Sequence, residues 1–335
     1  MKWGQPPFLK GAYIVLAALL ILSVAFLAVL NLPGTKKESP ITYGATFSTE
    51  YAVSLGLDWK ETFIALLDDL GMRHFRINAY WSEIEAQKDL VVFDNLDFQL
   101  DEIAKRGGRV ILAVGRKLPR WPECHDPAWV RELPKKEIEE RLLKLVRIVA
   151  ERYKDHPAVD KWQVENEIVF PFGDCPNWLG LDSLQKEIDI VRSISDKPIV
   201  VTDSGEWTPW LPMAWYGDIL GSSLYLEAWN DFVGHVPFPI RPGYYQFKAW
   251  LVSPWKKNII FTELQAEPWG PKGVQEMTVE EAREYFPLEK MRSRIQFARD
   301  VGFSEVYLWG EEWWYWMKLH GDASYWDEGK KVFSH

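Results

Sequence analysis

The chain has 335 residues, a formal net charge of −9 and a pI of about 5.3. This acidic balance argues against a nucleic-acid partner, because nucleic-acid binders usually carry a basic patch. Two cysteines are too few for a metal framework, and the six histidines form no H-x-H or H-E-x-x-H motif. We therefore expect no metal and no cofactor. The G-x-S-x-G motif of serine hydrolases is also absent.

Residues 1–11 form a short tail, and residues 12–32 contain no charged side chain. About 20 apolar residues span a bilayer core as a helix, so this segment predicts a transmembrane anchor. A cleaved secretory signal is the alternative. We expect a single-pass membrane protein with an extracytoplasmic domain in the first case, and a secreted protein in the second. Residues 33–40 are a polar linker, and residues 41–335 suffice for one large α/β domain.

Short apolar runs alternate with amphipathic helical patterns throughout residues 41–335. The strand-like runs are 43–48, 74–79, 109–114, 159–164, 198–202, 222–226, 258–262 and 305–309. The helical patterns are 59–70, 96–105, 135–153, 184–194, 244–252 and 288–301. Gly71, Gly107 and Gly302 stand at expected helix ends, where a left-handed residue commonly closes a helix.

This alternation predicts parallel βαβ units, and eight such units predict a (β/α)8 TIM barrel. A doubly wound open sheet is the alternative, but it should carry a G-x-G-x-x-G turn, which the sequence lacks. In a TIM barrel the functional groups lie at the carboxyl ends of the strands. The residues that follow each run are therefore the candidate site.

Carboxylates, amides and aromatic side chains follow most of the predicted strands. The candidates, in chain order, are Arg76, Trp121, Asn166, Glu167, Tyr225, Glu263, Trp269 and Trp309. Glu167 follows the fourth strand and Glu263 the seventh, so the two carboxyl groups can face each other across the barrel mouth. A retaining glycosidase needs such a pair, one protonated and one ionised. Arg76 and Tyr225 are candidates to hold the ionised Glu263.

The order of these residues resembles that of the clan A glycoside hydrolases, such as families 5, 39 and 42. In that clan an Asn-Glu pair ends the fourth strand and its Glu is the acid/base, which corresponds to Asn166 and Glu167. The nucleophile ends the seventh strand in a Thr-Glu or similar context, which corresponds to Thr262 and Glu263. The resemblance covers residues 41–335. It implies a retaining glycoside hydrolase that cleaves β-linked oligo- or polysaccharides by double displacement.

The resemblance also implies supporting roles. It assigns Arg76 and Tyr225 to the nucleophile, and Trp309 to the floor of the −1 sugar subsite. Three features depart from the family pattern. Ile168 stands where the clan commonly has proline, Glu165 adds a second acid beside the Asn-Glu pair, and Glu267 is an alternative nucleophile. A buried Glu165 would need a partner or a proton.

The chain contains 19 tryptophans, which can serve core packing or stack on the flat faces of sugar rings. Ten lie in apparent loops, where exposure and sugar contact are expected: Trp81, Trp121, Trp178, Trp207, Trp210, Trp229, Trp269, Trp313, Trp314 and Trp316. Trp121 could instead pin its own loop.

Several other candidates also have structural interpretations. Arg76 could simply satisfy a buried carboxylate, and Tyr225 could be interior packing. Asp203 and Glu206 could cap the following segment rather than bind sugar. Two further acids, Glu311 and Glu312, are either site residues or solvated loop residues.

Cys124 and Cys175 follow adjacent strands, so either a disulfide or two free thiols is compatible with the sequence. Two other functions remain open: a non-catalytic carbohydrate-binding barrel at the cell surface, and a transglycosylase that uses the same residues. A β-glucan or β-mannan is the first expectation for the substrate, and a β-galactoside the second. The sequence implies no obligate protein partner.

Overall fold

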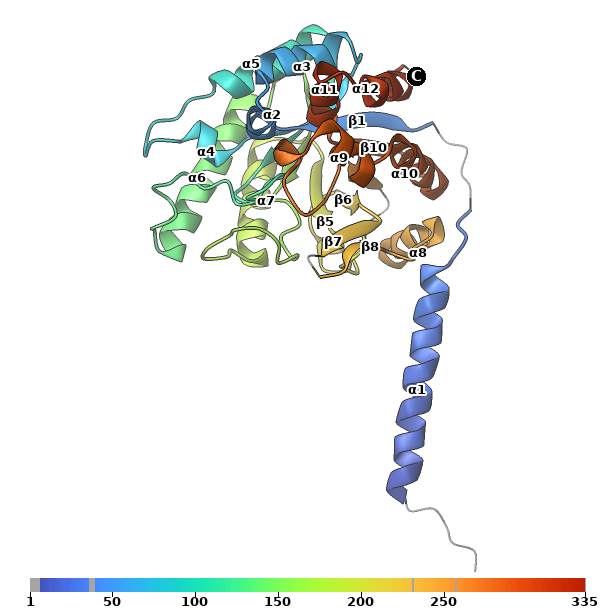
Figure 1. The fold of residues 1–335 in the computed structure, drawn as a ribbon. Coiled ribbons are helices and arrows are strands. Elements are labelled where there is room, and N and C mark those ends of the chain that lie inside the picture. The colour runs from blue at the N-terminus through green and yellow to red at the C-terminus, as the bar shows by residue number, and fades with distance from the viewer. Residues whose placement is uncertain (1–6, 36–39, 231, 257, 335) are drawn as a thin grey trace, which may run out of the picture.

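The computed structural model describes residues 7–35, 40–230, 232–256 and 258–334, and only the backbone of residues 7–14. Within these residues, eight parallel strands close into a barrel in the order β1-β10-β9-β6-β5-β4-β3-β2 (Figure 1). The strands are β1 (Thr42–Phe47), β2 (His74–Asn78), β3 (Arg109–Val114), β4 (Val159–Val164), β5 (Ile199–Asp203), β6 (Ile219–Leu224), β9 (Ile259–Gln265) and β10 (Glu305–Trp309). Each corresponds to one of the predicted runs, so the predicted TIM barrel is confirmed.

The strand register brings the carboxyl ends of the strands to one rim. In β2, Arg76 pairs with Thr46 of β1 and with Ile111 of β3. In β4, Gln163 pairs with Val200 of β5. Because all neighbours in the barrel are parallel, the residues that follow the strands meet around the same opening.

Six helices cover the barrel at the positions that the amphipathic patterns predicted. They are α3 (Trp59–Asp68), α5 (Asp94–Lys105), α6 (Lys135–Tyr153), α7 (Leu181–Ile194), α8 (Pro242–Val252) and α10 (Leu288–Val301). The inward face of α6 buries Ile138, Leu142, Leu145, Val146 and Val149. Each such side chain contributes roughly 1.5–3 kcal/mol through burial. Gly302 ends α10 in the left-handed conformation, with φ 77°.

Several elements near the rim were not predicted. They are α2 (Thr49–Ser54), α4 (Trp81–Ile84), η1 (Met213–Trp215), the hairpin β7 (Glu227–Asn230) and β8 (Gly234–Pro237), η2 (Val274–Glu276), α9 (Val279–Tyr285), α11 (Glu311–Leu319) and α12 (Ser324–Phe333). The segment after β10, predicted as a loop, is the helix α11. The prediction of exposure was wrong for five tryptophans, which pack in the core: Trp81, Trp210, Trp313, Trp314 and Trp316.

The first helix, α1 (Pro7–Leu30), projects away from the barrel (Figure 1). Its C-terminal end is fixed to α8, because the N–H of Arg241 donates to the carbonyl of Leu30 at 2.9 Å and that of Gly243 to Leu32 at 3.1 Å. Among the residues described, no helix is both long enough and apolar enough to cross a membrane. The predicted span, residues 12–32, includes residues 12–14, whose side chains lie outside the described part.

Candidate active site

A cavity of about 560 Å³ opens at the carboxyl rim of the barrel. Seven of the eight predicted site residues line it: Trp121, Asn166, Glu167, Tyr225, Glu263, Trp269 and Trp309. The eighth, Arg76, is completely buried in β2, where it contacts two of these residues. The strand-end positions in the sequence therefore located one continuous site.

Glu263 has a positively charged and a hydroxyl partner. Arg76 Nη1 lies 2.8 Å from Glu263 Oε1, and the Tyr225 hydroxyl donates to Oε2 at 3.0 Å. The other donors of Arg76 reach Asn166 Oδ1 at 2.6 Å and Gln163 Oε1 at 2.7 Å. Both partners are therefore positioned to stabilise negative charge on this carboxylate. Arg76 does satisfy a buried carboxylate, and that carboxylate faces the cavity.

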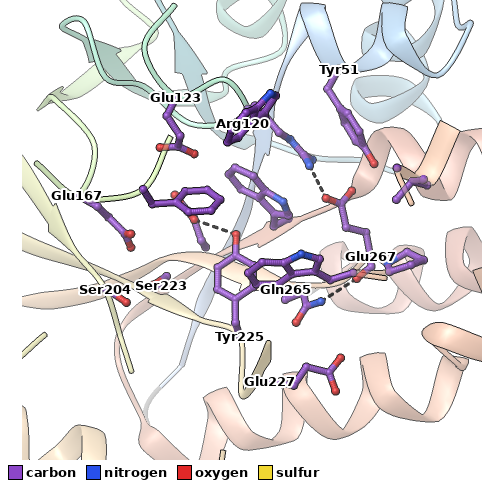
Figure 2. Close-up of a pocket in the computed structure, with 18 of the residues that line it drawn as sticks. Tyr51, Arg120, Glu123, Glu167, Ser204, Ser223, Tyr225, Glu227, Gln265 and Glu267 are labelled. Carbon is purple, nitrogen blue, oxygen red and sulfur yellow. Dashed lines mark hydrogen bonds and ion pairs between the residues drawn. The ribbon is translucent and has the colours of Figure 1, made fainter. Parts of the chain in front are cut away.

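The three residues after β4 turn sharply, which sends their side chains in different directions. Glu165 and Glu167 have φ values of 58° and 44°, a left-handed conformation that is uncommon for residues with a Cβ. The N–H of Glu167 donates to Thr202 Oγ1 at 2.9 Å, which fixes the turn against β5. The Glu167 carboxyl group lines the cavity, and Figure 2 shows it on the side opposite Glu267.

The environment of Glu167 differs from that of Glu263. Burial raises the pKa of Glu167 well above its ordinary value, and the negative charge of Glu263 raises it further. The neighbouring cation Lys117 opposes this effect only in part. One cavity therefore contains a carboxyl group whose pKa is raised, Glu167, and a carboxylate paired with a guanidinium, Glu263. This is the division of states that general acid and nucleophile require.

Glu165 is a structural residue. Its carboxylate accepts the N–H groups of Arg116 at 2.7 Å and Lys117 at 2.8 Å, and it hydrogen-bonds to the carboxyl group of Glu187. Gly115 makes room for it, since a Cβ there would stand 2.8 Å from Glu165 Oε1. The sequence left open whether a buried Glu165 would have a partner or a proton, and the structure gives it three hydrogen-bond partners.

Glu267, the alternative nucleophile, belongs to a separate network. Arg120 Nη1 pairs with Glu267 Oε1 (Figure 2), and Nη2 lies 3.3 Å from Glu312 Oε2. The guanidinium carbon is 3.7 Å from the ring centroid of Tyr51 and 4.0 Å from that of Trp309. Arg120 therefore supports Trp309 and neutralises Glu267, and it covers part of the indole that was expected to floor a sugar subsite.

Glu311 and Glu312 are both buried in the first turn of α11, which excludes the alternative that they are solvated loop residues. The N–H of Ser48 donates to Glu312 Oε1 at 2.7 Å. Burial raises the pKa of Glu312 to about 7, although Arg120 lowers it. Burial also holds the pKa of Glu311 well above its usual range.

Asp203 ends β5, Glu206 follows it, and both have structural contacts. Asp203 Oδ1 accepts the N–H of Ser204 at 3.0 Å. Glu206 Oε1 accepts the N–H of Tyr225 at 2.8 Å and the hydroxyl of Tyr245 at 2.6 Å. Glu206 also lines the cavity, and it positions the residue that holds Glu263.

Aromatic side chains rim the cavity. Trp121 is 67% exposed and contacts Phe172, and Trp207 is 61% exposed and contacts Phe238. Trp269 stands edge-on to Tyr225, with ring centroids 5.6 Å apart. Exposed rings around a cavity that also contains carboxyl groups suit a ligand with flat apolar faces and polar edges, which is the character of a sugar chain.

The sequence did not single out Glu123, which lines the cavity close to Glu167 (Figure 2). It lies in the long loop after β3, next to a disulfide between Cys124 and Cys175 with Cα atoms 5.1 Å apart. Burial raises the pKa of Glu123 to about 7, whereas Lys117 lowers it. In the sequence, the many charged and aromatic residues of this loop are the feature that could have pointed to Glu123. Throughout the described residues, no group of three or more His, Cys, Asp or Glu side chains could hold a metal ion.

Comparison with known proteins agrees with this geometry. Residues 37–224, more than half of the chain, match the cellulase family, glycosyl hydrolase family 5. The chain is 28% identical over 166 residues to the β-galactosidase LacZ of Heyndrickxia coagulans, covering 42% of this chain and 23% of the relative. It is 26% identical over 198 residues to the β-galactosidase Pbg of Clostridium perfringens, covering 52% of this chain and 27% of the relative. The chain thus spans about a quarter of the length of these curated relatives.

A solved structure extends the comparison of the fold. The β-galactosidase of the Antarctic haloarchaeon Halorubrum lacusprofundi aligns with a TM-score of 0.56 at 16% identity, covering 80% of this chain and 52% of that one. This similarity supports the barrel architecture. Because the family match covers the barrel from β1 to β6, including Asn166 and Glu167, the chain belongs to the cellulase family, glycosyl hydrolase family 5, and is an O-glycosyl hydrolase.

Proposed function

We propose that this hydrolase is a retaining β-glycosidase in which Glu167 is the acid/base and Glu263 the nucleophile. The observation that carries the proposal is the contrast between the two carboxyl groups in one cavity. Glu263 is stabilised as a carboxylate by Arg76 and Tyr225, whereas burial and the charge of Glu263 raise the pKa of Glu167. Glu267 is a weaker candidate for the nucleophile, because it pairs with Arg120 and not with Arg76, the cation that stabilises Glu263.

In the first step, a Glu263 oxygen attacks C1 of the sugar while Glu167 donates its proton to the leaving glycosidic oxygen. The C1–O bond to the leaving group breaks and a glycosyl ester with Glu263 forms. Formation of the ester neutralises Glu263, which lowers the pKa of Glu167 and prepares it to act as a base. Glu167 then takes a proton from water, the water oxygen attacks C1, and the Glu263 carboxylate leaves. Arg76 and Tyr225 stabilise that carboxylate before and after the cycle.

We propose a β-linked oligosaccharide as the substrate. The cavity volume and the exposed rings of Trp121, Trp207 and Trp269 support a ligand longer than one sugar. The names of the relatives in the sequence comparison favour β-galactosides as the first compounds to test, ahead of the β-glucan or β-mannan expected from sequence. Transfer to an acceptor sugar would use the same two residues, so the acceptor must be varied in the assay.

The test is hydrolysis of a panel of aryl β-glycosides and β-linked oligosaccharides by the full chain in detergent, with the product anomer followed by NMR. Wild-type enzyme should release the β-anomer first, and Glu167→Gln or Glu263→Gln should lose roughly 10²–10⁴-fold or more in kcat. Asp174→Asn, an exposed acid paired with Arg131, is the matched control and should keep its activity. An α-anomer as the first product would refute the retaining mechanism. A folded wild-type chain that binds glycans but cleaves none would favour a carbohydrate-binding barrel.

We further propose that residues 12–32 anchor the enzyme to a membrane, with the barrel outside the cytoplasm. The support is the absence of charge in this segment, the exposure of the described α1 side chains from Val15 to Leu27, and the Cys124–Cys175 disulfide, which suits an oxidising compartment. The full chain should stay in the membrane pellet after alkaline carbonate extraction, and external protease should reach the barrel. Release into the carbonate supernatant with an intact N-terminus would contradict an anchor, and a mature chain that begins after residue 32 would indicate a cleaved signal.

A further inference from the structure

Three exposed tryptophans lie away from the cavity. Trp215 is 69% exposed, Trp250 67% and Trp255 51%, and none of the three lines the cavity. An indole side chain has roughly 150–250 Å² of surface, so the three together expose on the order of 400 Å². A contiguous apolar patch of that size commonly marks an interaction site. Stacking on a sugar in the catalytic cavity does not explain these rings.

The three indoles and one phenylalanine form the tryptophan patch: Trp215, Phe247, Trp250 and Trp255. The ring centroids of Trp215 and Trp255 are 5.7 Å apart, and those of Phe247 and Trp250 are also 5.7 Å apart. The N–H of Trp255 donates to the carbonyl of Val252 at 3.0 Å, so Trp255 directly follows the last turn of α8. Lys256 donates to the carbonyl of Gly217, which ties this turn to the segment after η1. The patch therefore covers the C-terminal end of α8 and the neighbouring η1.

The outer face of α8 differs from those of other covering helices. Helices α6, α7 and α10 carry charged side chains of both signs, as expected for solvated helices. In contrast, α8 contains one charged residue, Lys248, which is buried and donates to the carbonyl of Gly205 at 2.6 Å. Asp218, which follows η1, is paired with Arg192 at 2.8 Å. The exposed side of α8 is therefore aromatic and uncharged, which indicates that it is not simply a solvated face.

The same face of α8 receives the end of α1. It carries four residues at the helical spacing i, i+3, i+4 and i+7: Gly243, Gln246, Phe247 and Trp250. Leu32 covers Gly243, since a Cβ added there would stand 2.5 Å from the Leu32 Cβ, and Gln246 Oε1 accepts the N–H of Thr35 at 2.8 Å. Trp250 lies two turns beyond Gly243, or roughly 10 Å along the helix. The chain that leaves α1 and the tryptophan patch thus share one surface, which Figure 1 shows on the side of the barrel from which α1 projects.

We propose that the tryptophan patch rests in the headgroup region of the lipid bilayer that holds α1, so that the α8 side of the barrel lies against the membrane. This inference rests on the proposed membrane anchor. The indole suits this environment, because its ring is apolar and its N–H needs a polar partner, and tryptophan is enriched at membrane–water interfaces for this reason. The headgroup region extends roughly 5–8 Å beyond the hydrocarbon core, so an indole this close to the end of the anchor can reach it.

The patch gives the barrel a second point of attachment. A barrel held only by the end of α1 could rotate and tilt above the membrane. With the patch in the headgroup region as well, the barrel keeps one orientation, and the cavity faces a constant direction relative to the bilayer.

The experiment places the full chain in lipid nanodiscs and attaches a fluorophore at Ser253→Cys, an exposed position between Trp250 and Trp255. The native cysteines do not react with the label, because they form a disulfide. Lipids with a nitroxide near the headgroup should quench the label at position 253. They should leave it bright at Leu319→Cys, an exposed position at the end of α11, on the side of the barrel opposite α1 (Figure 1).

The tryptophans are then removed in the labelled chain. With Trp215, Trp250 and Trp255 all replaced by Ser, quenching at position 253 should fall to the level at position 319, while the Tm and the recovery in the carbonate pellet stay unchanged. Trp121→Ser is the matched control, because Trp121 is also 67% exposed but stands at the cavity rim, and it should leave the quenching as it is.

The outcomes separate this inference from the proposed anchor. Quenching at position 253 no stronger than at position 319 overturns the inference and leaves the anchor intact. Equal quenching with and without the three tryptophans also overturns it, because α1 alone would then bring this surface to the bilayer. Release of the full chain by carbonate overturns both. Where the triple variant fails to fold, Trp250→Ser alone answers the question, and unchanged quenching in that variant overturns the inference.

Discussion

The buried pair of Glu165 and Glu187 makes the stability of the barrel depend on pH. The two carboxyl groups hydrogen-bond to each other, so one of them must carry a proton. Glu165 accepts two backbone N–H groups, which favour its ionised form. Burial, and then the charge of Glu165, raise the pKa of Glu187 well above its ordinary value. Glu187 is therefore the protonated partner, and Ser183 Oγ donates to its Oε1 at 3.2 Å.

Replacing Glu187 with Gln tests this assignment. The amide keeps the shape of the protonated acid: its oxygen can accept from Ser183, and its NH₂ group can donate to Glu165. In wild type, the folded chain holds a proton that the unfolded chain releases above a pH of about 4.3. Stability is therefore fully present below that pH and falls as the pH rises, by up to about 1.4 kcal/mol per pH unit. The variant has no such proton. The difference in the free energy of unfolding between the variant and wild type should therefore grow by roughly 2–3 kcal/mol, in favour of the variant, as the pH rises from 5 to 7.

The assay is urea unfolding of the full chain in detergent, followed by tryptophan fluorescence at pH 5, 6 and 7. Other buried acids impose their own pH dependence on both proteins, so the quantity of interest is the difference between wild type and Glu187→Gln. Asp189→Asn, an exposed acid on the same helix, is the control and should leave the pH dependence unchanged. If the stability curves of wild type and Glu187→Gln run parallel between pH 5 and pH 7, Glu187 is not the proton carrier.

Arg120→Met should lower the free energy of unfolding by roughly 3–5 kcal/mol, because Glu267 and Glu312 lose their buried cation. Burial raises the pKa of Glu312 to about 7, so the loss should be larger at pH 8 than at pH 5.5, and equal losses at both values would contradict this account. Exchanging Cys124 and Cys175 for Ser should cost about 2–4 kcal/mol and lower the Tm, measured beside wild type with and without reductant. A wild-type Tm that does not change on full reduction would show that the disulfide contributes nothing.

Much of the fold could be predicted because each strand and covering helix carries its own local pattern. The run of β3 is apolar at successive positions, as expected for a strand buried on both faces. The pattern of α6 repeats with the period of a helix, and the observed bounds are the predicted ones. Residues at the strand ends, such as Glu167 and Glu263, could be placed for the same reason, since the parallel topology brings all these ends together.

The predictions failed where burial depends on distant parts of the chain. Trp313 and Trp314 stand among charged residues, which suggested an exposed loop, yet α11 packs both into the core. Glu312 was open between a site residue and a solvated acid, but it accepts the N–H of Ser48, which is 264 residues away in the sequence. Local composition does not reveal such contacts, because the environment of a loop residue depends on which distant segments pack against it in the fold.

The sequence by itself determined the barrel and the ring of strand-end residues, because hydrophobic periodicity and strand order are local properties of the chain. Only the tertiary structure decided that Arg120 pairs with Glu267 and that Glu123 reaches the cavity. Long loops set these contacts, and their paths depend on the disulfide and on packing between segments far apart in sequence. Charge states follow from those contacts, since burial and neighbouring charges set the pKa of each acid.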